Sequence, residues 1–473
     1  MKISNKILLG TALFFTVIYW IILIFRIPVF QVIPGYFWHF MAFINTPLSS
    51  LWIIVPIIGL AAVVFIMIFS KKLTKDWYIL LLLIILGYVT QTGSSLMEGR
   101  GMNDLRRRMI DAGHSEFGRL AALEGNLYDI SSHYEEFLQK SDSIRFANTK
   151  PPGQLLFYML MQKISNLFNP QETPFNRYLR LIIFASFAFP LLTYLAIIPI
   201  YYFCKMFMER QTALLACLLY IFTPSVTLVT MHLDQVLYPF LFMICMFLIL
   251  HACRNNRIVM TLICGAAAWI AVYVSFSLLT VIPAVLFCII AYSLSHSGVL
   301  FNSKSTKITV AFAGGLVLLQ LLSYIALNYD IFVRYHNAMA YHQSWKEWES
   351  GWGSNFLYAG LNFIEFACWI GLPIAIFFGA AIVTSIRNIV RKIYNFDSLL
   401  TLITALLILI LGFFGKTKSE VGRLWIFMMP MVCIVVVADL SRRFKGNTRW
   451  IAGGLLTLQL ITILLMKRFQ DFW

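Results

Sequence analysis

Eight polar side chains, most of them ionisable, belong to types that suit chemistry at a phosphate-bearing substrate. They lie in or beside the segments that separate long apolar runs: Asp111, His114, Glu116, Lys150, Arg180, Asp234, Glu420 and Arg423. A carboxylate in a cleft can remove a proton from an attacking hydroxyl. Lysine and arginine can neutralise the charge that grows on a phosphate leaving group, and the planar arginine fork binds phosphate oxygens in pairs. This chemistry requires a fold that brings distant segments to one place.

The composition indicates that this fold is embedded in a membrane. Hydrophobic residues make up 60% of the 473 residues and charged residues 12%, against about 45–50% and ~25% in soluble domains. Backbone groups in lipid must pair internally, and the run at 81–86 lacks the alternation of a β-barrel strand. We predict an all-α polytopic protein with about 13 transmembrane helices, at 7–25, 51–70, 78–96, 181–203, 212–230, 236–252, 258–275, 278–293, 308–327, 356–384, 398–414, 424–440 and 449–466.

The short basic loops assign the two sides of the membrane. If the predicted spans alternate, seven clusters of lysine and arginine fall on one side, which the positive-inside rule makes cytoplasmic. The sequence thus predicts a plasma-membrane protein with a cytoplasmic N-terminus and a retained first helix. The net charge of +16 leaves room for an anionic lipid partner, whereas the absence of a basic soluble domain argues against nucleic acid.

The remaining segments then face the extracytoplasmic side. We divide the chain into N-terminal transmembrane helices at 1–96, an extracytoplasmic loop at 97–180, and a helix bundle at 181–473 with a further external loop at 328–355. In the first loop, apolar residues recur at helical spacing from Asn103 to Leu123, which predicts an amphipathic helix, and 128–139 predicts a second. A stiff Lys-Pro-Pro-Gly turn at 150–153 precedes an apolar stretch that is too short to count as a span.

The order of these parts resembles the GT-C superfamily of lipid-dependent glycosyltransferases, which includes protein O-mannosyltransferases and aminoarabinose transferases. The resemblance rests on four motifs and a late stretch: 111–119, Lys150–Gly153, Arg177/Arg180, His232–Asp234 and 420–430. It implies inverting transfer of a sugar from a polyprenyl-phosphate donor to an unknown acceptor, which is a glycan, a lipid or a protein, on the extracytoplasmic face.

The resemblance also implies roles for the candidate residues. Asp111 would be the catalytic base, with Glu116 as the alternate, because this chain has one acid where members often have two adjacent ones. On a continuous helix these two carboxylates would lie ~140° apart, so a turn at Gly113 would be needed for both to face one substrate. The other six residues would bind substrate: Lys150, Arg180 and Arg423 the phosphate, His114 and Asp234 the hydroxyls, and Glu420 beside Arg423. The sequence requires no cofactor, and no residue spacing supports a divalent metal.

Simpler readings compete with these roles. Asp111 and Glu116 fit the solvent-exposed face of an interfacial helix. Lysine and arginine side chains beside transmembrane spans often extend to the membrane surface. Asp234 is harder to explain in this way, because an acid between apolar spans is costly unless it is paired, hydrated or used as a helix cap. A transporter or lipid-linked-sugar flippase is the alternative function, although charges within the spans are scarce and no internal repeat is evident. A non-catalytic scaffold is a third reading.

Overall fold

The structure is a computed structural model that describes residues 4–29, 48–70, 75–111, 113, 115–123, 125–140, 144–168, 170, 172–346, 352–414, 417 and 419–470. Over these residues the secondary structure is helical and contains no β-strand. The predicted all-α class of a polytopic membrane protein is confirmed. His114 and residues 347–351 of the predicted external loop at 328–355 lie outside the described residues.

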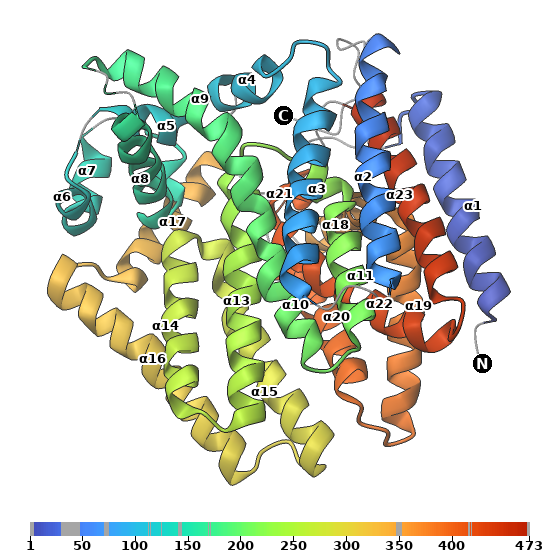
Figure 1. Ribbon diagram of the computed structural model, residues 1–473. Coiled ribbons are helices and arrows are strands. Elements are labelled where there is room, and N and C mark those ends of the chain that lie inside the picture. Colours follow the sequence, from blue (N-terminus) through green and yellow to red (C-terminus); the bar gives the residue numbers. More distant parts are fainter. Residues whose placement is uncertain are drawn as a thin grey trace.

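Twenty-three α-helices follow one another along the chain (Figure 1). They are α1 Asn5–Ile24, α2 Ile54–Phe69, α3 Asp76–Leu96, α4 Asn103–Asp111, α5 Ser115–Ala122, α6 Leu127–Ser132, α7 Tyr134–Gln139, α8 Gly153–Phe168, α9 Pro174–Thr193, α10 Ile197–Lys205, α11 Arg210–Ile221, α12 Pro224–Leu228, α13 Leu233–Asn255, α14 Ile258–Val274, α15 Val281–Ser297, α16 Ser303–Leu327, α17 Ile331–Lys346, α18 Trp352–Ile370, α19 Leu372–Val390, α20 Phe396–Phe414, α21 Val421–Leu424, α22 Met429–Arg443 and α23 Thr448–Phe469, with a 3₁₀ turn η2 at Ala147–Thr149. These counts apply to the described part of the chain.

Ten of the described helical segments are long and apolar enough to cross a bilayer, and three shorter apolar helices, at Arg210–Ile221, Ile258–Val274 and Phe356–Ile370, accompany them. Every predicted span contains one or more helices. The segment 212–230 is the clearest difference, because α11 ends at Ile221 and the short α12 starts at Pro224. A proline at the start of α12 has no N–H to continue the preceding helix, which explains the interruption.

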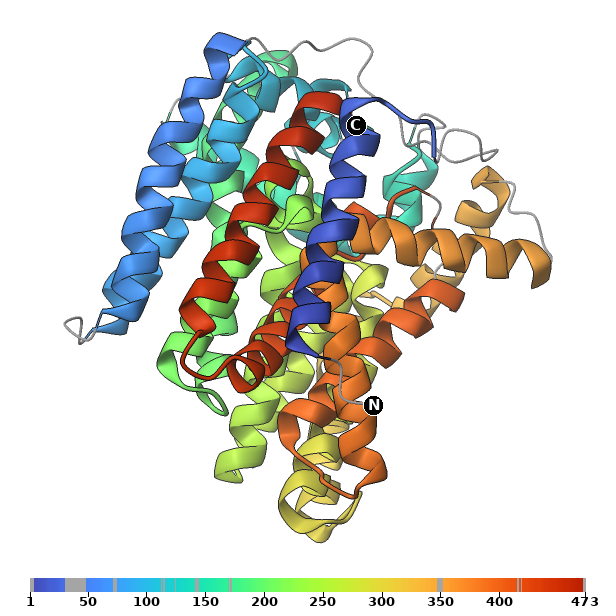
Figure 2. The ribbon, with the colours of Figure 1, turned by 90° about the vertical axis from the view of Figure 1, so that its right-hand side faces the viewer.

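The helices of the first outer loop gather at one end of the bundle. In Figure 1, α4 to α8 lie together there with α17, while α1 begins and α23 ends at opposite ends of the bundle, as Figure 2 also shows. The predicted single helix over 103–123 is instead two helices, α4 and α5, on either side of Gly113. The predicted helix over 128–139 is likewise divided into α6 and α7 at His133.

A glycine divides the long predicted span at 356–384. Gly371 separates α18 from α19 with a φ of +92°, and in Figure 2 α18 lies across the direction of α19. A Cβ at Gly371 would lie 1.8 Å from Oε1 of Gln459 on α23. The same Gln459 amide donates from Nε2 to the carbonyl of Ile370 at 2.7 Å. Glycine is required here both by the backbone conformation and by the close approach of α23.

Replacing Gly371 by alanine should therefore lower the stability of the bundle. We expect a loss of about 2 kcal/mol, because the substitution adds backbone strain and displaces Gln459. The apparent melting temperature of the purified protein in detergent measures it. Gly379→Ala is the matched control, since Gly379 lies inside α19 with open space around it. An equal melting temperature for both variants would contradict this account of the break.

Candidate functional site

A buried ion pair joins the start of α13 to α21. Asp234 lies in the first turn of α13 and is fully buried. Nη1 of Arg423 lies 3.0 Å from Oδ2 of Asp234, and Nη2 of the same guanidinium lies 3.2 Å from Oε1 of Glu420. Burial opposes the charged guanidinium, but the carboxylates of Asp234 and Glu420 raise the pKa of Arg423 above its ordinary value. The fold thus holds a permanent cation between two acids that are 186 residues apart in sequence.

The local sequence explains how these two side chains reach each other. His232 is the N-cap residue of α13, so Asp234 is inside the helix and is not its cap. A carboxylate in the first turn is stabilised by the helix dipole. Arg423 is on a helix of four residues, α21, that follows Glu420 directly. The Glu420–Arg423 pair that the simpler reading expected is present, but Arg423 also reaches Asp234.

Lys150 and His232 lie in the same electrostatic environment. The ammonium group of Lys150 acts on the Asp234 carboxylate in the same sense as Arg423 does. Burial, and next the positive charge of Arg423, lower the pKa of His232 to about 3. The imidazole is therefore neutral at ordinary pH and offers a hydrogen-bonding group without a charge. Four of the predicted substrate-binding residues, Lys150, Asp234, Glu420 and Arg423, are thus brought together.

Glu116 lies in the first turn of α5 and holds the backbone that leads to Lys150. Its Oε2 accepts hydrogen bonds from the backbone N–H groups of Arg145 at 2.9 Å and Phe146 at 3.1 Å, and its Oε1 accepts one from Ala147 at 2.8 Å. The carboxylate is buried. Both oxygens are therefore engaged in fixing the segment that enters η2, directly before Lys150.

Asp111 has a more open position. It is the last residue of α4, its side chain is 37% exposed, and it pairs with Arg107 one helical turn earlier at 2.6 Å. It does not pair with Lys150, Asp234 or Arg423. The break that separates α4 from α5 falls between Asp111 and Glu116, as the turn at Gly113 required. The two acids nevertheless have different surroundings, one solvated and the other bonded to main chain.

The two arginines of α9 also differ. Arg177 is buried and donates from Nη1 to the carbonyl of Ala122 at 3.1 Å and from Nη2 to that of Glu172 at 2.6 Å. Arg180 is half-buried and forms no ion pair in the described part of the chain. Arg177 thus anchors the loop to α9, and Arg180 keeps its charge available.

Sequence reasoning missed a buried charge network beside the site. Glu98, just after α3, pairs with Lys467 near the end of α23 and with Nη2 of Arg108 on α4 at 3.4 Å. Lys467 and Arg108 lower the pKa of Glu98 although its burial acts in the opposite direction. Arg108 also acts on His232, so the network adjoins the Arg423 site. No local pattern in the sequence predicts this charge network, since Glu98 and Lys467 are 369 residues apart.

Asp104 belongs to this network and makes stability depend on pH. Burial, and next the charge of Glu98, raise the pKa of Asp104 from 3.8 to about 6. Between pH 4 and pH 6 the unfolded chain loses this proton while the folded protein keeps it, so the Asp104 contribution to stability falls as the pH rises. Asp104→Asn should remove that fall, since an amide oxygen can still accept from the N–H of Arg100, which now bonds Oδ2 at 3.2 Å.

Apparent melting temperatures of the wild type and Asp104→Asn from pH 4 to pH 7.5 check this prediction. The variant should gain stability relative to the wild type as the pH rises through 6. Asp129→Asn is the control, because Asp129 lies on α6, away from this network. A constant difference between variant and wild type over this range would contradict the assignment.

A second missed contact ties the two outer loops together. Arg334 on α17 is buried, and its Nη1 donates to both carboxylate oxygens of Glu135 on α7 at 3.0 Å each. Its Nη2 donates to the backbone carbonyl of Asn148 at 2.6 Å, and Asn337 adds a bond to Glu135 at 3.0 Å. Arg334 is thus a positioning residue for the turn that carries Lys150.

The carboxylates of the site do not fit a metal ion. Among the described residues no three histidine, cysteine, aspartate or glutamate side chains gather in one place. Asp234 and Glu420 pair with Arg423, Asp111 pairs with Arg107, and Glu116 accepts from backbone N–H groups. A divalent cation would have to compete with a cation or a donor at each of these acids. The described arrangement instead suits an anionic ligand.

Comparison with known proteins identifies the fold. No protein-family model matches the chain, and no curated protein matches its sequence. The chain is similar to the crystal structure of the Archaeoglobus fulgidus oligosaccharyltransferase in complex with zinc and sulfate, with a TM-score of 0.52 and 12% identity over 82% of this chain and 53% of that one. The apo form of the same enzyme gives a TM-score of 0.51 and 11% identity over 84% and 56%.

The chain therefore spans about half the length of the oligosaccharyltransferase that it resembles. At this level of identity the comparison establishes the fold alone. The chain is a polytopic all-α membrane protein whose fold is similar to that of the Archaeoglobus fulgidus oligosaccharyltransferase.

Proposed function

We propose that this protein is a membrane glycosyltransferase of GT-C type. It moves a sugar from a polyprenyl-phosphate donor to an acceptor hydroxyl on the extracytoplasmic face of the plasma membrane, with inversion at the anomeric carbon. The observation that carries the proposal is the half-buried Arg423, which pairs with the fully buried Asp234 and with Glu420 and has Lys150 close by. The shared fold with an oligosaccharyltransferase supports the same reaction class.

In this proposal Arg423 and Lys150 stabilise the leaving group of the reaction. As the bond from the sugar to the donor phosphate breaks, negative charge grows on the phosphate oxygens. Fixed cations in a water-poor pocket stabilise such charge strongly because they need not reorganise during the reaction. Asp234 and Glu420 hold the Arg423 fork in place, and Lys150 contributes a second charge from the opposite loop. The half-buried Arg180 supplies a further cation at α9.

Asp111 serves as the base in this proposal. Its carboxylate is open to solvent, and its partner Arg107 is itself 44% exposed. An exposed ion pair of this kind contributes at most about 1 kcal/mol and so yields readily to a substrate. Glu116 has no comparable freedom, because three backbone N–H groups occupy its oxygens. We therefore assign proton removal to Asp111 and the support of the Lys150 turn to Glu116, while His114 and Asp234 remain proposed contacts for hydroxyl groups.

The test is transfer by the purified protein from radiolabelled polyprenyl-phospho-sugars. Asp111→Ala and Lys150→Ala should each lower the rate of transfer at least about 100-fold, the usual effect of losing a general base or a charge-stabilising group. Lys140→Ala is the control, since Lys140 is an exposed lysine of the same outer loop. Transfer that survives both substitutions would remove these assignments. Movement of the lipid-linked sugar across vesicles without transfer would establish the flippase alternative instead.

A further inference from the structure

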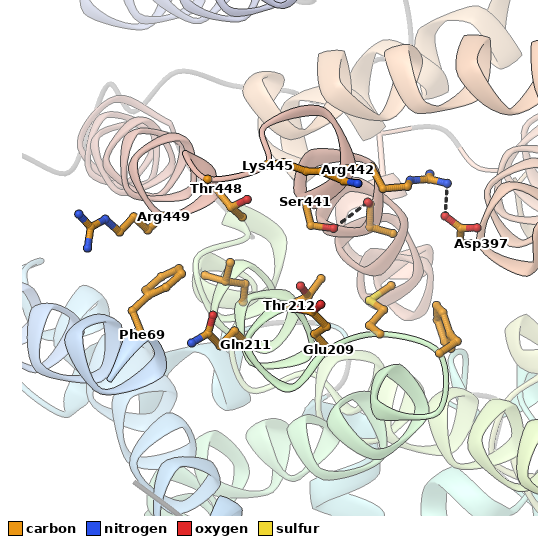
Figure 3. A pocket seen from close by; sticks show the side chains of 15 residues that line it. Phe69, Glu209, Gln211, Thr212, Asp397, Ser441, Arg442, Lys445, Thr448 and Arg449 are labelled. Carbon is orange, nitrogen blue, oxygen red and sulfur yellow. Dashed lines mark hydrogen bonds and ion pairs between the residues drawn. The ribbon is translucent and has the colours of Figure 1, made fainter. Parts of the chain in front are cut away.

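A cavity of about 560 Å³ lies at the end of the bundle opposite the Arg423 site. Helix α3 runs from the cavity towards the Arg423 site. Asp76 at its start pairs with Arg210 beside the cavity, and its other end leads to Glu98. A helix of 21 residues is about 30 Å long. The cavity is lined by the α10–α11 connection, the end of α2, the start of α20, and the turn between α22 and α23 (Figure 3). It is therefore a separate place with its own chemistry.

The charged side chains of the cavity leave an excess of positive charge. Arg442 pairs with Asp397, so these two charges cancel within the wall. Lys445 and Arg449 are exposed residues that form no ion pair in the described part of the chain. Arg449 lies over the ring of Trp450, with 4.8 Å from its guanidinium carbon to the ring centroid. Among the described lining residues, the exposed carboxylate of Glu209 is the one remaining negative charge that offsets these two cations.

Two helices begin at this cavity without a side-chain cap. Glu209 is the N-cap residue of α11 and Asn447 that of α23, and neither side chain accepts a hydrogen bond from the first turn of its helix. Gln211 and Thr212 of α11 and Thr448 of α23 line the cavity. The unpaired N–H groups of a helix start and its dipole favour an anion.

The nearly buried side chain of Thr212 supplies an independent sign of a ligand. Thr212 is only 8% exposed, lines the cavity, and makes no hydrogen bond in the described structure. The other hydroxyls of the wall are satisfied, since Ser441 donates to the carbonyl of Ala438 at 3.0 Å and Thr448 donates to that of Phe444 at 3.1 Å. A cavity-lining hydroxyl that makes no hydrogen bond to protein can donate to a bound acceptor.

We propose that this cavity binds the phosphate group of an anionic ligand. Lys445 and Arg449 neutralise the phosphate, the starts of α11 and α23 donate backbone N–H groups, and Thr212 donates its hydroxyl. Phe69, Phe207 and Leu215 provide an apolar wall beside these donors, which suits a phosphate that carries an acyl or prenyl chain. The same phosphate chemistry is present in a phospholipid head group and in soluble phosphate, and the experiment separates these two sources.

The full chain in detergent would be titrated with short-chain phosphatidylglycerol, short-chain phosphatidylcholine and inorganic phosphate, with the ligand-induced rise in melting temperature as the readout. Phosphatidylglycerol should bind at least tenfold more tightly than phosphatidylcholine. A double Lys445→Ala, Arg449→Ala variant should lose at least tenfold in affinity, and Thr212→Val should lose severalfold while keeping its shape. Binding should also weaken as salt is added, since exposed cations are screened.

The controls decide between the outcomes. Arg391→Ala removes an exposed cation at the C-cap of α19, outside the cavity, and should leave binding unchanged. Binding of inorganic phosphate that is lost in the double variant supports a soluble phosphate ligand, and binding of phosphatidylglycerol alone supports a lipid. Equal affinity in the wild type and the variants, or no binding of any of these anionic probes, would overturn the proposal. Sugar transfer is not part of this readout, so it stands apart from the proposed function.

Discussion

Replacing Arg423 by alanine should abolish sugar transfer and also destabilise the protein. The substitution removes the cation that we propose to face the leaving phosphate, and we expect it to lower the rate of transfer about 1,000-fold. It also leaves the carboxylate of Asp234 buried without its partner. An unpaired buried charge costs about 3–5 kcal/mol of folding free energy. Transfer rates and melting temperatures of the purified variant measure the two effects.

A second substitution separates these two effects. Adding Asp234→Asn to Arg423→Ala removes the unpaired charge, so the melting temperature should recover most of the loss while transfer stays absent. Arg423→Lys should retain the ion pair but lose the planar fork, giving a stable protein with transfer reduced about 100-fold. Arg119→Ala, an exposed arginine on α5, is the control. Recovery of transfer in the double variant would show that Arg423 acts only by holding Asp234.

Replacing Glu98 by glutamine should have the second large effect, here on folding. Lys467 is 3% exposed and pairs with Glu98, and Arg108 shares the same carboxylate. Glutamine keeps the shape but leaves Lys467 buried with an uncompensated charge, which costs about 3–5 kcal/mol. The apparent melting temperature in detergent should therefore fall by more than in any single surface substitution of the outer loop.

The reciprocal variant makes this prediction specific. Glu98→Gln together with Lys467→Met removes both buried charges and should restore much of the melting temperature, because apolar replacement of a whole buried pair is often neutral. Glu136→Gln, on the exposed face of α7, should have no effect. If the double variant is as unstable as the sum of its single changes, the two charges are not energetically coupled.

The spans and their interruption followed from local patterns. Apolar runs gave the positions of the long helices, and the Gly-Leu-Pro sequence at 371–373 indicated the break that separates α18 from α19. A turn at Gly113 was the condition for Asp111 and Glu116 to face one substrate, and the single helix predicted over 103–123 is divided there. These features depend on residues that are neighbours in the chain, so the sequence carries them directly. For Asp234 the sequence indicated only that the acid must be paired, hydrated or used as a helix cap, and the structure shows the pair with Arg423.

The partners across the fold could not be predicted in this way. Lys467 reads as the basic end of a span, and only the packing of α23 against the outer loop shows that it meets Glu98. Glu116 reads as a free acid, but its hydrogen-bond donors are main-chain N–H groups, which have no signature in the sequence. The role of Arg334 depends similarly on where α17 lies. Such contacts are set by tertiary geometry rather than by residue type.

Arg334 joins the segments 97–180 and 328–355 through one side chain. One nitrogen of its guanidinium holds the Glu135 carboxylate and another holds the Asn148 carbonyl. Since a single side chain makes both contacts, an outward movement of α17 would also loosen the backbone that leads to Lys150. The two segments are therefore expected to move as one unit, with the position of Lys150 tied to that of α17.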